Sequence, residues 1–506
     1  MTQSLKDPEL LRRRLLQQDL RLLRTAEDLA RTIRAEPRFC QSEPRAYLVG
    51  GFVRDAVLGL RSKDADLEVF GLPPERLETL LKHRYPGKVV GVGKAFGILK
   101  LHLAHDVELD VSVPRRESKR GPGHTGFLVE GDPDMSLEEA ARRRDFTINA
   151  MAVDPLDYHF FDPFGGLDDL QARVLRVVDR ERFGDDPLRV YRGVGFAARF
   201  GLQVEPATFE LMAEMVARGD LAELSRERVT TEIKKLLLKS ERPSVGFELM
   251  VRLGIIARHY PELEALRHTP QDPEWHPEGD VWTHTMLVLD QAALIVRRPE
   301  WGFDEEEKLQ VLLGSLCHDL GKPATTRLRR HKGVERLRAL GHPEAGRGPA
   351  QSLLSRWTFG LAVERGALVL TTQHLAPGQL YGQLQRGEMN QEQYANAVRK
   401  LLKRIHPVSW RVLLAGCEAD FRGRGLPGQE KAVFAAGEML ARTVRARGLE
   451  DEAVRPLLLG RDLLARGVTP GPQVGDYIRR IEEARDRGEI RTREEALQLL
   501  ERLLRP

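Results

Sequence analysis

The stretch from Leu48 to Phe70, LVGGFVRDAVLGLRSKDADLEVF, constrains the fold of this chain more than any other segment. An apolar run leads into two adjacent glycines, and the apolar positions that follow have the spacing of one helix face. A polar loop then leads into Asp64-Ala65-Asp66 and a further apolar run. The stretch therefore predicts a strand, a glycine turn, a short helix and a second strand.

Alternation along the second strand places Asp64 and Asp66 on the same face. Neighbouring carboxylates repel each other, and a divalent cation such as Mg²⁺ or Mn²⁺ relieves that repulsion through oxygen ligands. Gly50 and Gly51 lie directly before the predicted helix, where free backbone N–H groups favour a phosphate. A polar loop with an accidental Asp-x-Asp is the alternative interpretation.

Two later segments add polar residues to the same region. The strand-like run Val107–Val113 places Glu108, Asp110 and Ser112 on one face, which predicts either a third catalytic carboxylate or a solvated strand surface. The segment RRRDFTINAM, residues 142–151, offers arginines that can neutralise phosphate and Asp and Asn side chains that can form hydrogen bonds.

The order of these motifs resembles the class II tRNA nucleotidyltransferases and bacterial poly(A) polymerases. The resemblance implies Mg²⁺ on Asp64 and Asp66, with Asp110 accepting the proton of an attacking hydroxyl. It also implies a flexible loop at residues 115–126 and a nucleotide pocket bordered by the turn at residues 91–97. The residues expected to contact the nucleotide are Gly50, Gly51, Arg54, Arg144, Asp145, Asn149, Asp186, Arg189 and Arg192.

Asp186 and Arg189 lie three residues apart at a predicted helix start, so they share one face. Alone, this spacing predicts an ordinary surface ion pair. In the resembled family an EDxxR motif reads the incoming CTP or ATP, which implies that role for this pair. Asp185 replaces the family's Glu and Gly195 replaces its usual Arg, and both departures leave the choice of nucleotide open.

A second group of polar residues follows after residue 276. Adjacent His and Asp at a helix end can bind one metal, although a lone histidine is more often a packing residue. The ordered pattern resembles the HD superfamily of metal-dependent phosphohydrolases, and a purely structural HD fold is the alternative. Four histidines favour Mn, Ni, Co or Fe, with Asp319 bridging two metals and Lys322 neutralising phosphate. The implied ligands are His284, His318, Asp319, His342, His374 and Asp420.

Composition sets the remaining expectations. The 506 residues predict several domains, and the formal charge of +4 favours local rather than bulk contact with nucleic acid. Three cysteines and the lack of a long apolar run predict a cytoplasmic protein without a membrane span. We interpret the five tryptophans, Trp275 among them, as packing residues.

The expected fold is α+β, with a nucleotidyltransferase-type mixed sheet in the head followed by a helical neck, body and HD domain. The predicted ranges are a helical extension (1–45), the head (46–175), a base-reading and RNA-binding neck (176–265), the HD domain (266–425) and a helical tail (426–506). We expect the extension and tail to pack on their neighbouring domains rather than to contact RNA.

The expected function is addition of all or part of the 3′-terminal CCA to tRNA from CTP and ATP, with phosphohydrolase activity in the HD domain. The expected partners are tRNA, CTP and ATP, with no membrane and no obligate protein partner evident. A poly(A) polymerase, or an HD phosphohydrolase whose head only binds RNA, are the alternatives. A non-enzymatic RNA-binding module is disfavoured, because it has no need of paired carboxylates in a basic pocket.

Overall fold

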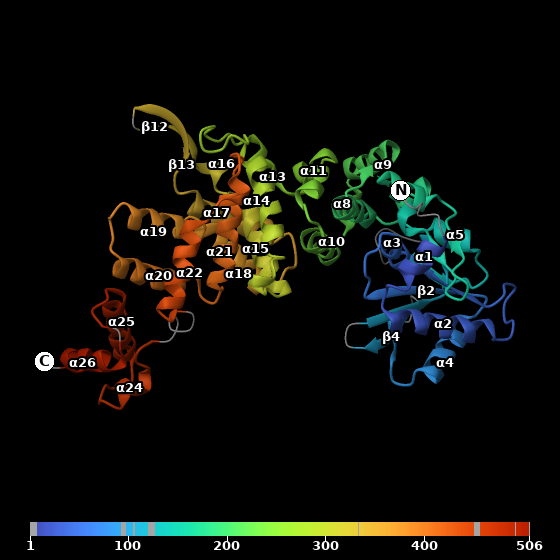
Figure 1. Cartoon of the computed structure of the whole chain (residues 1–506), viewed down its shortest axis with the longest axis horizontal. Coiled ribbons are helices and arrows are strands. Elements are labelled where there is room, and N and C mark those ends of the chain that lie inside the picture. Colours follow the sequence, from blue (N-terminus) through green and yellow to red (C-terminus); the bar gives the residue numbers. More distant parts are fainter. Residues whose placement is uncertain are drawn as a thin grey trace. The chain divides into compact units, whose positions relative to one another are not determined.

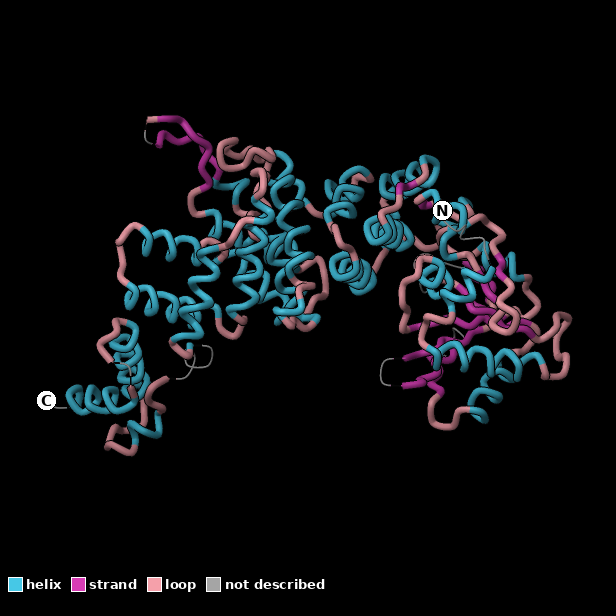
Figure 2. Tube along the Cα trace, viewed as in Figure 1, coloured by secondary structure: helices cyan, strands magenta, loops and turns pink. Residues whose placement is uncertain are grey.

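The computed structural model describes residues 8–92, 98–104, 107–119, 127–331, 333–449, 456–490 and 492–504. The chain divides into two compact units, one containing the chain up to Ile233 together with Arg252–Gly254, and the other containing the remainder. The large sheet belongs to the first unit, whereas the second consists almost entirely of helices (Figures 1 and 2). The expected α+β fold with a mixed sheet and a mostly helical remainder is confirmed.

A seven-stranded mixed sheet forms the centre of the first unit. Its strands are β1 (Arg45–Val49), β2 (Asp64–Phe70), β3 (Val89–Val92), β4 (Ile98–Ala104), β5 (Val107–Ser112), β8 (Ala152–Val153) and β9 (Phe160–Phe161). They lie in the order β3-β4-β5-β2-β1-β8-β9. β2 is antiparallel to β1 and parallel to β5. The two strands that carry the candidate catalytic carboxylates are therefore neighbours.

Helices cover this sheet, and the N-terminal extension is among them. The helices are α1 (Pro8–Leu15), α2 (Leu20–Arg34), α3 (Gly51–Val57), α4 (Pro74–Arg84), α5 (Leu137–Arg142), α6 (Gly166–Ala172) and α7 (Arg180–Phe183), and β6 (Arg115–Lys119) pairs with β7 (Phe127–Gly131). Arg14 donates a hydrogen bond to the carbonyl of Val57, and Gln18 donates one to that of Leu60 at 2.8 Å. The extension thus packs on the head, as expected.

The chain becomes helical after the sheet. These elements are α8 (Leu188–Phe200), α9 (Pro206–Arg218) and α10 (Arg226–Lys239), with a short parallel pair, β10 (Val174–Leu175) and β11 (Gln203–Val204). α8 buries Val190, Val194 and Ala197 and ends at Gly201, whose φ of 62° lies in the left-handed region that glycine tolerates. Its opposite side presents arginine and phenylalanine side chains.

The second unit is built around the buried helix α15 (Glu305–Cys317). Its helices are α11 (Ser244–Arg252), α12 (Ile255–His259), α13 (Pro261–Glu264), α14 (Val281–Ile295), α16 (Lys322–Thr325), α17 (His342–Leu354), α18 (Leu361–Gln373), α19 (Ala376–Gln385), α20 (Gln391–Ile405), α21 (Trp410–Arg422) and α22 (Ala435–Ala446). A capping box between Asp304 and Glu307 starts α15, and every residue from Leu309 to Cys317 is buried. From Leu309 onward α15 is buried on all sides, and it packs against α14, α18 and α21.

Two features depart from this bundle. The hairpin of β12 (Thr326–His331) and β13 (Val334–Ala339) adds a two-stranded sheet to a region expected to be wholly helical. The tail forms α24 (Gly460–Leu464), α25 (Pro472–Asp486) and α26 (Arg493–Leu504) around its own small apolar core, and α25 packs on α20. None of the described helices is both long and apolar enough to cross a membrane.

Candidate functional site

The three candidate catalytic carboxylates of the head meet on β2 and β5. Because these strands are parallel, Asp66 lies opposite Asp110 and Asp64 opposite Glu108. Lys100 Nζ lies 2.6 Å from Glu108 Oε2 and 3.3 Å from Asp110 Oδ1. The alternation deduced from the sequence therefore brings Asp64, Asp66 and Asp110 to one face.

The chemistry of this cluster fits a divalent cation. Asp66 reaches solvent, yet the surrounding protein withdraws water from its carboxyl and raises its pKa, and the charges of Asp110, Glu68 and Asp64 act in the same direction, against Arg144. Oδ1 of Asp110 is buried and makes no hydrogen bond. Convergent carboxylates of this kind are the oxygen ligands that Mg²⁺ prefers.

The glycine turn touches this cluster directly. Gly50 has a φ of 70°, and a Cβ atom placed on it would lie 2.5 Å from Arg144 Nη1 and 3.2 Å from Asp66 Oδ2. Only glycine fits here, because a side chain would be strained and would collide with both groups. Gly51 begins α3 on the other side of this turn. The structure thus brings the turn, Arg144 and Asp66 together.

Four of the expected nucleotide-contacting residues form one chain of hydrogen bonds. Arg54 Nη1 donates to Asn149 Oδ1 at 2.5 Å, and Asn149 Nδ2 donates to Asp145 Oδ1 at 2.9 Å. Arg192 Nε then donates to the other oxygen of Asp145 at 2.6 Å. Burial alone would raise the pKa of Asp145, but Arg192 and Asn149 outweigh it and hold that pKa below its usual value.

Arg54 differs from its expected role as a triphosphate ligand. Its guanidinium is buried, donates to Asp55 Oδ1 at 2.8 and 2.6 Å, and faces the rings of Phe196 and Phe200. Arg199 of α8 also approaches Asp55, at 3.3 Å. Sequence reasoning did not find Asp55 or the two rings. Their only signal is the spacing of Phe196 and Phe200, four residues apart on one helix face.

The two expected base-reading residues contact other groups rather than each other. Asp186 precedes α8, accepts the N–H of Leu188 at 3.1 Å, and pairs with Arg228 at 2.8 Å. Arg189 donates at 2.8 Å to the carbonyls of Arg182 and Arg143. The simple surface ion pair that the spacing alone predicted is therefore not formed.

The six expected HD residues converge in the second unit. Nε2 of His284 lies 3.2 Å from Asp420 Oδ1 and 3.7 Å from Asp319 Oδ2. The facing Nε2 atoms of His342 and His374 are 3.1 Å apart, and His342 Nε2 lies 3.3 Å from Asp319 Oδ1. Two groups of possible ligands result, namely His284 with His318 and Asp420, and Asp319 with His342 and His374.

Asp319 stands between these two groups. Oδ2 lies 3.1 Å from His318 Nε2 on one side, while Oδ1 faces His342 on the other. α15 determines this position, because the helix ends directly before the His318-Asp319 pair. Lys322 Nζ lies 2.7 Å from Asp319 Oδ2, so the lysine expected to neutralise phosphate is committed to a carboxylate.

Hydrogen bonds orient all four histidines toward the centre. Nδ1 of His318 contacts the carbonyl of Ser315 at 2.7 Å, Nδ1 of His342 that of Ala339 at 2.8 Å, and Nδ1 of His374 that of Thr371 at 3.1 Å. A carbonyl only accepts, so Nδ1 carries the proton and the Nε2 lone pair of a neutral ring points inward. Such an inward set of lone pairs fits metal ligation.

The fourth histidine uses a carboxylate that the sequence analysis missed. Glu278 Oε1 lies 2.9 Å from Nδ1 of both His284 and His276, and Glu278 Oε2 accepts the N–H of Gly425 at 3.0 Å. Burial opposes ionisation of Glu278, but the two histidines hold its pKa well below the usual range. Its neighbours in HPEGD carry no periodic signal that marks it in advance.

Electrostatics in this cluster also fit a cation. Burial alone would raise the pKa of Asp319, yet His318 and Lys322 hold it well below its usual value. Burial lowers the pKa of His374 to about 4, so this ring is neutral at physiological pH and can act as a ligand. Burial alone would lower the pKa of His318, but the negative charges of Asp319 and Asp420 raise it. The same negative charges would stabilise a metal ion.

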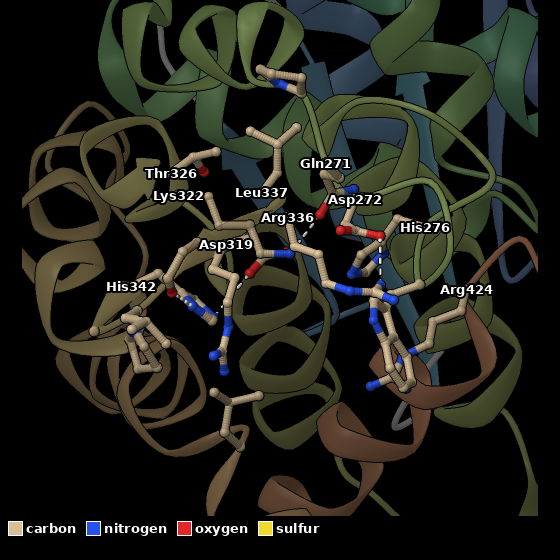
Figure 3. A pocket seen from close by; sticks show the side chains of 18 of the residues that line it. Gln271, Asp272, His276, Asp319, Lys322, Thr326, Arg336, Leu337, His342 and Arg424 are labelled. Carbon is tan, nitrogen blue, oxygen red and sulfur yellow. Dashed lines mark hydrogen bonds and ion pairs between the residues drawn. The ribbon is translucent and has the colours of Figure 1, made fainter. Parts of the chain in front are cut away.

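The cluster opens into a cavity of about 730 Å³. Figure 3 shows Asp319, Lys322 and His342 together in this cavity, with Gln271, Asp272 and Arg336 from other segments around them. Trp275, which we had interpreted as a packing residue, also lines it and is 57% exposed, so that interpretation is wrong.

Sequence families match three parts of the chain. The family described as Poly A polymerase head domain matches residues 46–176, the probable RNA and SrmB-binding site of polymerase A matches residues 201–266, and the HD domain matches residues 281–400. The nucleotidyltransferase and HD families generally use divalent metals. This agrees with the carboxylates on β2 and β5 of the head and with the groups of possible ligands in the second unit, which also include His276, Glu278 and His284.

Two curated relatives align with most of this chain. The Multifunctional CCA protein of Pasteurella multocida is 34% identical over 441 residues, covering 83% of this chain and 96% of the relative. That of Nitrosococcus oceani is 36% identical over 421 residues, covering 81% and 94%.

Solved structures share the fold. A CCA-adding enzyme in complex with CTP has a TM-score of 0.59 at 22% identity and covers 98% of each chain. The Thermotoga maritima CCA-adding enzyme complexed with tRNA has a TM-score of 0.55 at 21% identity, again covering 98% of each chain.

Proposed function

Because this chain belongs to the family of multifunctional CCA proteins, we propose that it adds all or part of the 3′-terminal CCA to tRNA from CTP and ATP without a nucleic-acid template. The observation that carries the proposal is the meeting of Asp64, Asp66 and Asp110 on adjacent strands beside the Gly50 turn. The work of such a protein places it in the cytoplasm.

In this proposal Asp64 and Asp66 hold Mg²⁺, which supplies charge neutralisation at the triphosphate and at the attacking 3′-hydroxyl. Asp110 accepts the proton of that hydroxyl. Arg144, which lies between the Gly50 turn and Glu68, contacts the triphosphate. The backbone of the turn receives phosphate oxygens beside the Arg144 guanidinium, since Gly50 and Gly51 carry no side chains of their own.

The residues on α8 select and support the base. Asp186 offers a hydrogen-bond acceptor, and Arg189 a donor, to the edge of the base. To do so, both side chains leave the protein groups that they contact in this structure. Arg54, Asn149 and Asp145 act as a buried support that connects α3 to α8 through Arg192. This support is a different role for Arg54 from the triphosphate contact that the resemblance implied.

The proposal is tested by the double variant Asp64→Asn, Asp66→Asn, which preserves side-chain size and removes both charges. Labelled nucleotide addition to tRNA without its CCA end is expected to fall to background, because the metal ligands are lost. Hydrolysis by the second unit is expected to continue, since its metal cluster is separate. Addition that survives in the double variant contradicts the assignment of the head.

A second activity is favoured by the convergence of four histidines and two aspartates in one cluster, of which Asp319, His342, His374 and Asp420 line the cavity. We propose that His284, His318, Asp319, His342, His374 and Asp420 hold one or two ions of Mn, Ni, Co or Fe. Such ions polarise a phosphoryl oxygen and lower the pKa of bound water. The substrates would be 2′,3′-cyclic phosphates or phosphomonoesters at RNA ends, which suits repair before CCA addition.

The variant pair His318→Ala and Asp319→Ala tests this second activity. We expect the loss of bound metal, measured by elemental analysis, and the loss of 2′,3′-cyclic phosphate hydrolysis, with nucleotide addition retained. A protein that loses the metal and keeps the hydrolysis contradicts the proposal.

Processive use of ATP alone on any RNA would instead identify a poly(A) polymerase.

A further inference from the structure

Arg424 is one of the cations that line the HD cavity, and its charge acts on Asp420. It follows α21, lines the cavity, and lies on the side opposite His342 in Figure 3. Its Nε atom is buried without a hydrogen bond, and its guanidinium makes no hydrogen bond or ion pair with any residue that the structure describes. The Arg424 side chain is half-buried, and a ligand that enters the cavity can accept a hydrogen bond from this one buried donor.

Three other cations line the cavity, namely Lys322, Arg336 and Arg338. Arg338 has an interaction partner of its own, and the other two are engaged by acids or amides. Lys322 Nζ lies 2.7 Å from Asp319 Oδ2 and 2.6 Å from Gln271 Oε1. Arg336 pairs with Asp272 at 3.5 Å and more closely with Glu274. Lys322 and Arg336 would each leave a carboxylate unpaired if they moved to bind an incoming anion. Arg424 can bind an anion without breaking such a pair.

The backbone on both sides of Arg424 is held against the metal cluster. A Cβ on Gly423 would lie 2.6 Å from Val288 of α14, so only glycine allows this approach. The N–H of Gly425 donates to Glu278, the carboxylate that also orients His284. The contacts of Gly423 with Val288 and of Gly425 with Glu278 thus fix the backbone on both sides of Arg424.

We propose that Arg424 binds a non-bridging oxygen of the substrate phosphate at the metal cluster. This inference rests on the proposed phosphohydrolase function and assigns one residue of that site. The planar guanidinium matches phosphate geometry and can donate two parallel hydrogen bonds. Its charge already acts on Asp420, four residues earlier, so the anion would lie beside the metal ligands.

The test measures the binding of inorganic phosphate to the Mn²⁺-loaded full chain by calorimetry. Arg424→Gln is expected to raise the phosphate dissociation constant about 10- to 100-fold, as the loss of charge-assisted hydrogen bonds does. Arg424→Lys is expected to lie between this variant and the unchanged protein, because it keeps the charge but loses the fork. Arg422→Gln is the matched control, since Arg422 pairs with Glu418 at 2.7 Å and does not line the cavity.

The outcomes separate the two proposals. Equal phosphate binding by the Arg424→Gln variant and the unchanged protein, with equal Mn²⁺ content, overturns the role of Arg424 alone. A failure of the unchanged, Mn²⁺-loaded protein to bind phosphate overturns both this role and the phosphohydrolase function. Loss of Mn²⁺ from both Arg424 variants also overturns the inference, because it assigns the residue to the metal site itself.

Discussion

Replacing Glu278 with Gln tests how the second unit prepares its histidines for a metal. In the present protein Glu278 Oε1 accepts from His284 and His276, both at 2.9 Å, and Oε2 accepts from Gly425 at 3.0 Å. Glutamine keeps the size of the side chain but has one acceptor oxygen instead of two. If that oxygen serves the histidines, the amide NH₂ faces the N–H of Gly425, and two donors meet.

The expected change in metal affinity follows from the position of Glu278, which is hydrogen-bonded to the candidate ligand His284. Loss of such a supporting carboxylate lowers metal affinity about 10- to 100-fold, which corresponds to about 1.4–2.8 kcal/mol. We expect Mn²⁺ affinity of the Glu278→Gln variant to fall by this factor. The loss arises because His284 is no longer held in one tautomer and its Nε2 lone pair is a weaker donor.

In the assay, the metal-free full chain is titrated with Mn²⁺, and binding is measured by calorimetry. Glu274→Gln is the matched control from the same loop, because Glu274 pairs with Arg336 and contacts no histidine. It is expected to leave Mn²⁺ affinity unchanged. An unchanged affinity in the Glu278→Gln variant refutes the reasoning, as does an equal loss in both variants.

Three further predictions concern other parts of the chain. Asp145→Asn is expected to cost about 1.5–3 kcal/mol in urea unfolding at pH 7, since it removes the charge-assisted hydrogen bond from Arg192, whose side chain is 34% exposed. Because the folded-state pKa of Asp145 is lowered, this difference is present above about pH 4 and shrinks as the pH falls through the folded-state value. Gly195→Arg is expected to raise the free energy of unfolding by about 0.5–1 kcal/mol, because a side chain there meets open space and glycine is a poor helix former. The ratio of CTP to ATP use is measured in the same variant. An unchanged ratio would show that Asp186 and Arg189 read the base without a contribution from residue 195. Trp275→Ala is expected to raise the KM for a nucleoside 2′,3′-cyclic phosphate about fivefold or more while leaving that for p-nitrophenyl phosphate unchanged, since a base stacks on an exposed indole; equal changes for both substrates contradict a stacking role.

The parts that the sequence predicted are those in which one periodicity determines the geometry. Alternation placed Asp64 and Asp66 on one face, and the register of β2 with β5 brought Asp110 beside them. Similarly, the apolar run before the His318-Asp319 pair predicted that this pair would lie at a helix end, and α15 ends directly before it. Whether these residues bind nucleotide or metal stays a prediction, as do the domain boundaries. The turn at residues 93–97 and the loop at residues 120–126 lie outside the described residues.

The parts that the sequence did not predict depend on contacts between distant segments. Glu278 supports His284 through the direction of a loop that no local pattern encodes. The resemblance implies that Arg54 contacts the nucleotide, which stays a prediction, but its hydrogen bonds to Asp55 and Asn149 are not encoded by any local pattern. Trp275 was assigned to the core by composition alone, although its loop exposes it.

The most direct test of the central claim is nucleotide addition by the unchanged protein to tRNA transcripts that end before the first C, before the second C and before the A. Each transcript is incubated with Mg²⁺ and with CTP, ATP or both, and the products are resolved at single-nucleotide length. The account predicts that the protein adds C, A or both in the order CCA and stops at the completed end. Extension of these transcripts with ATP alone, continuing past one residue and equally on an unrelated RNA, would contradict it.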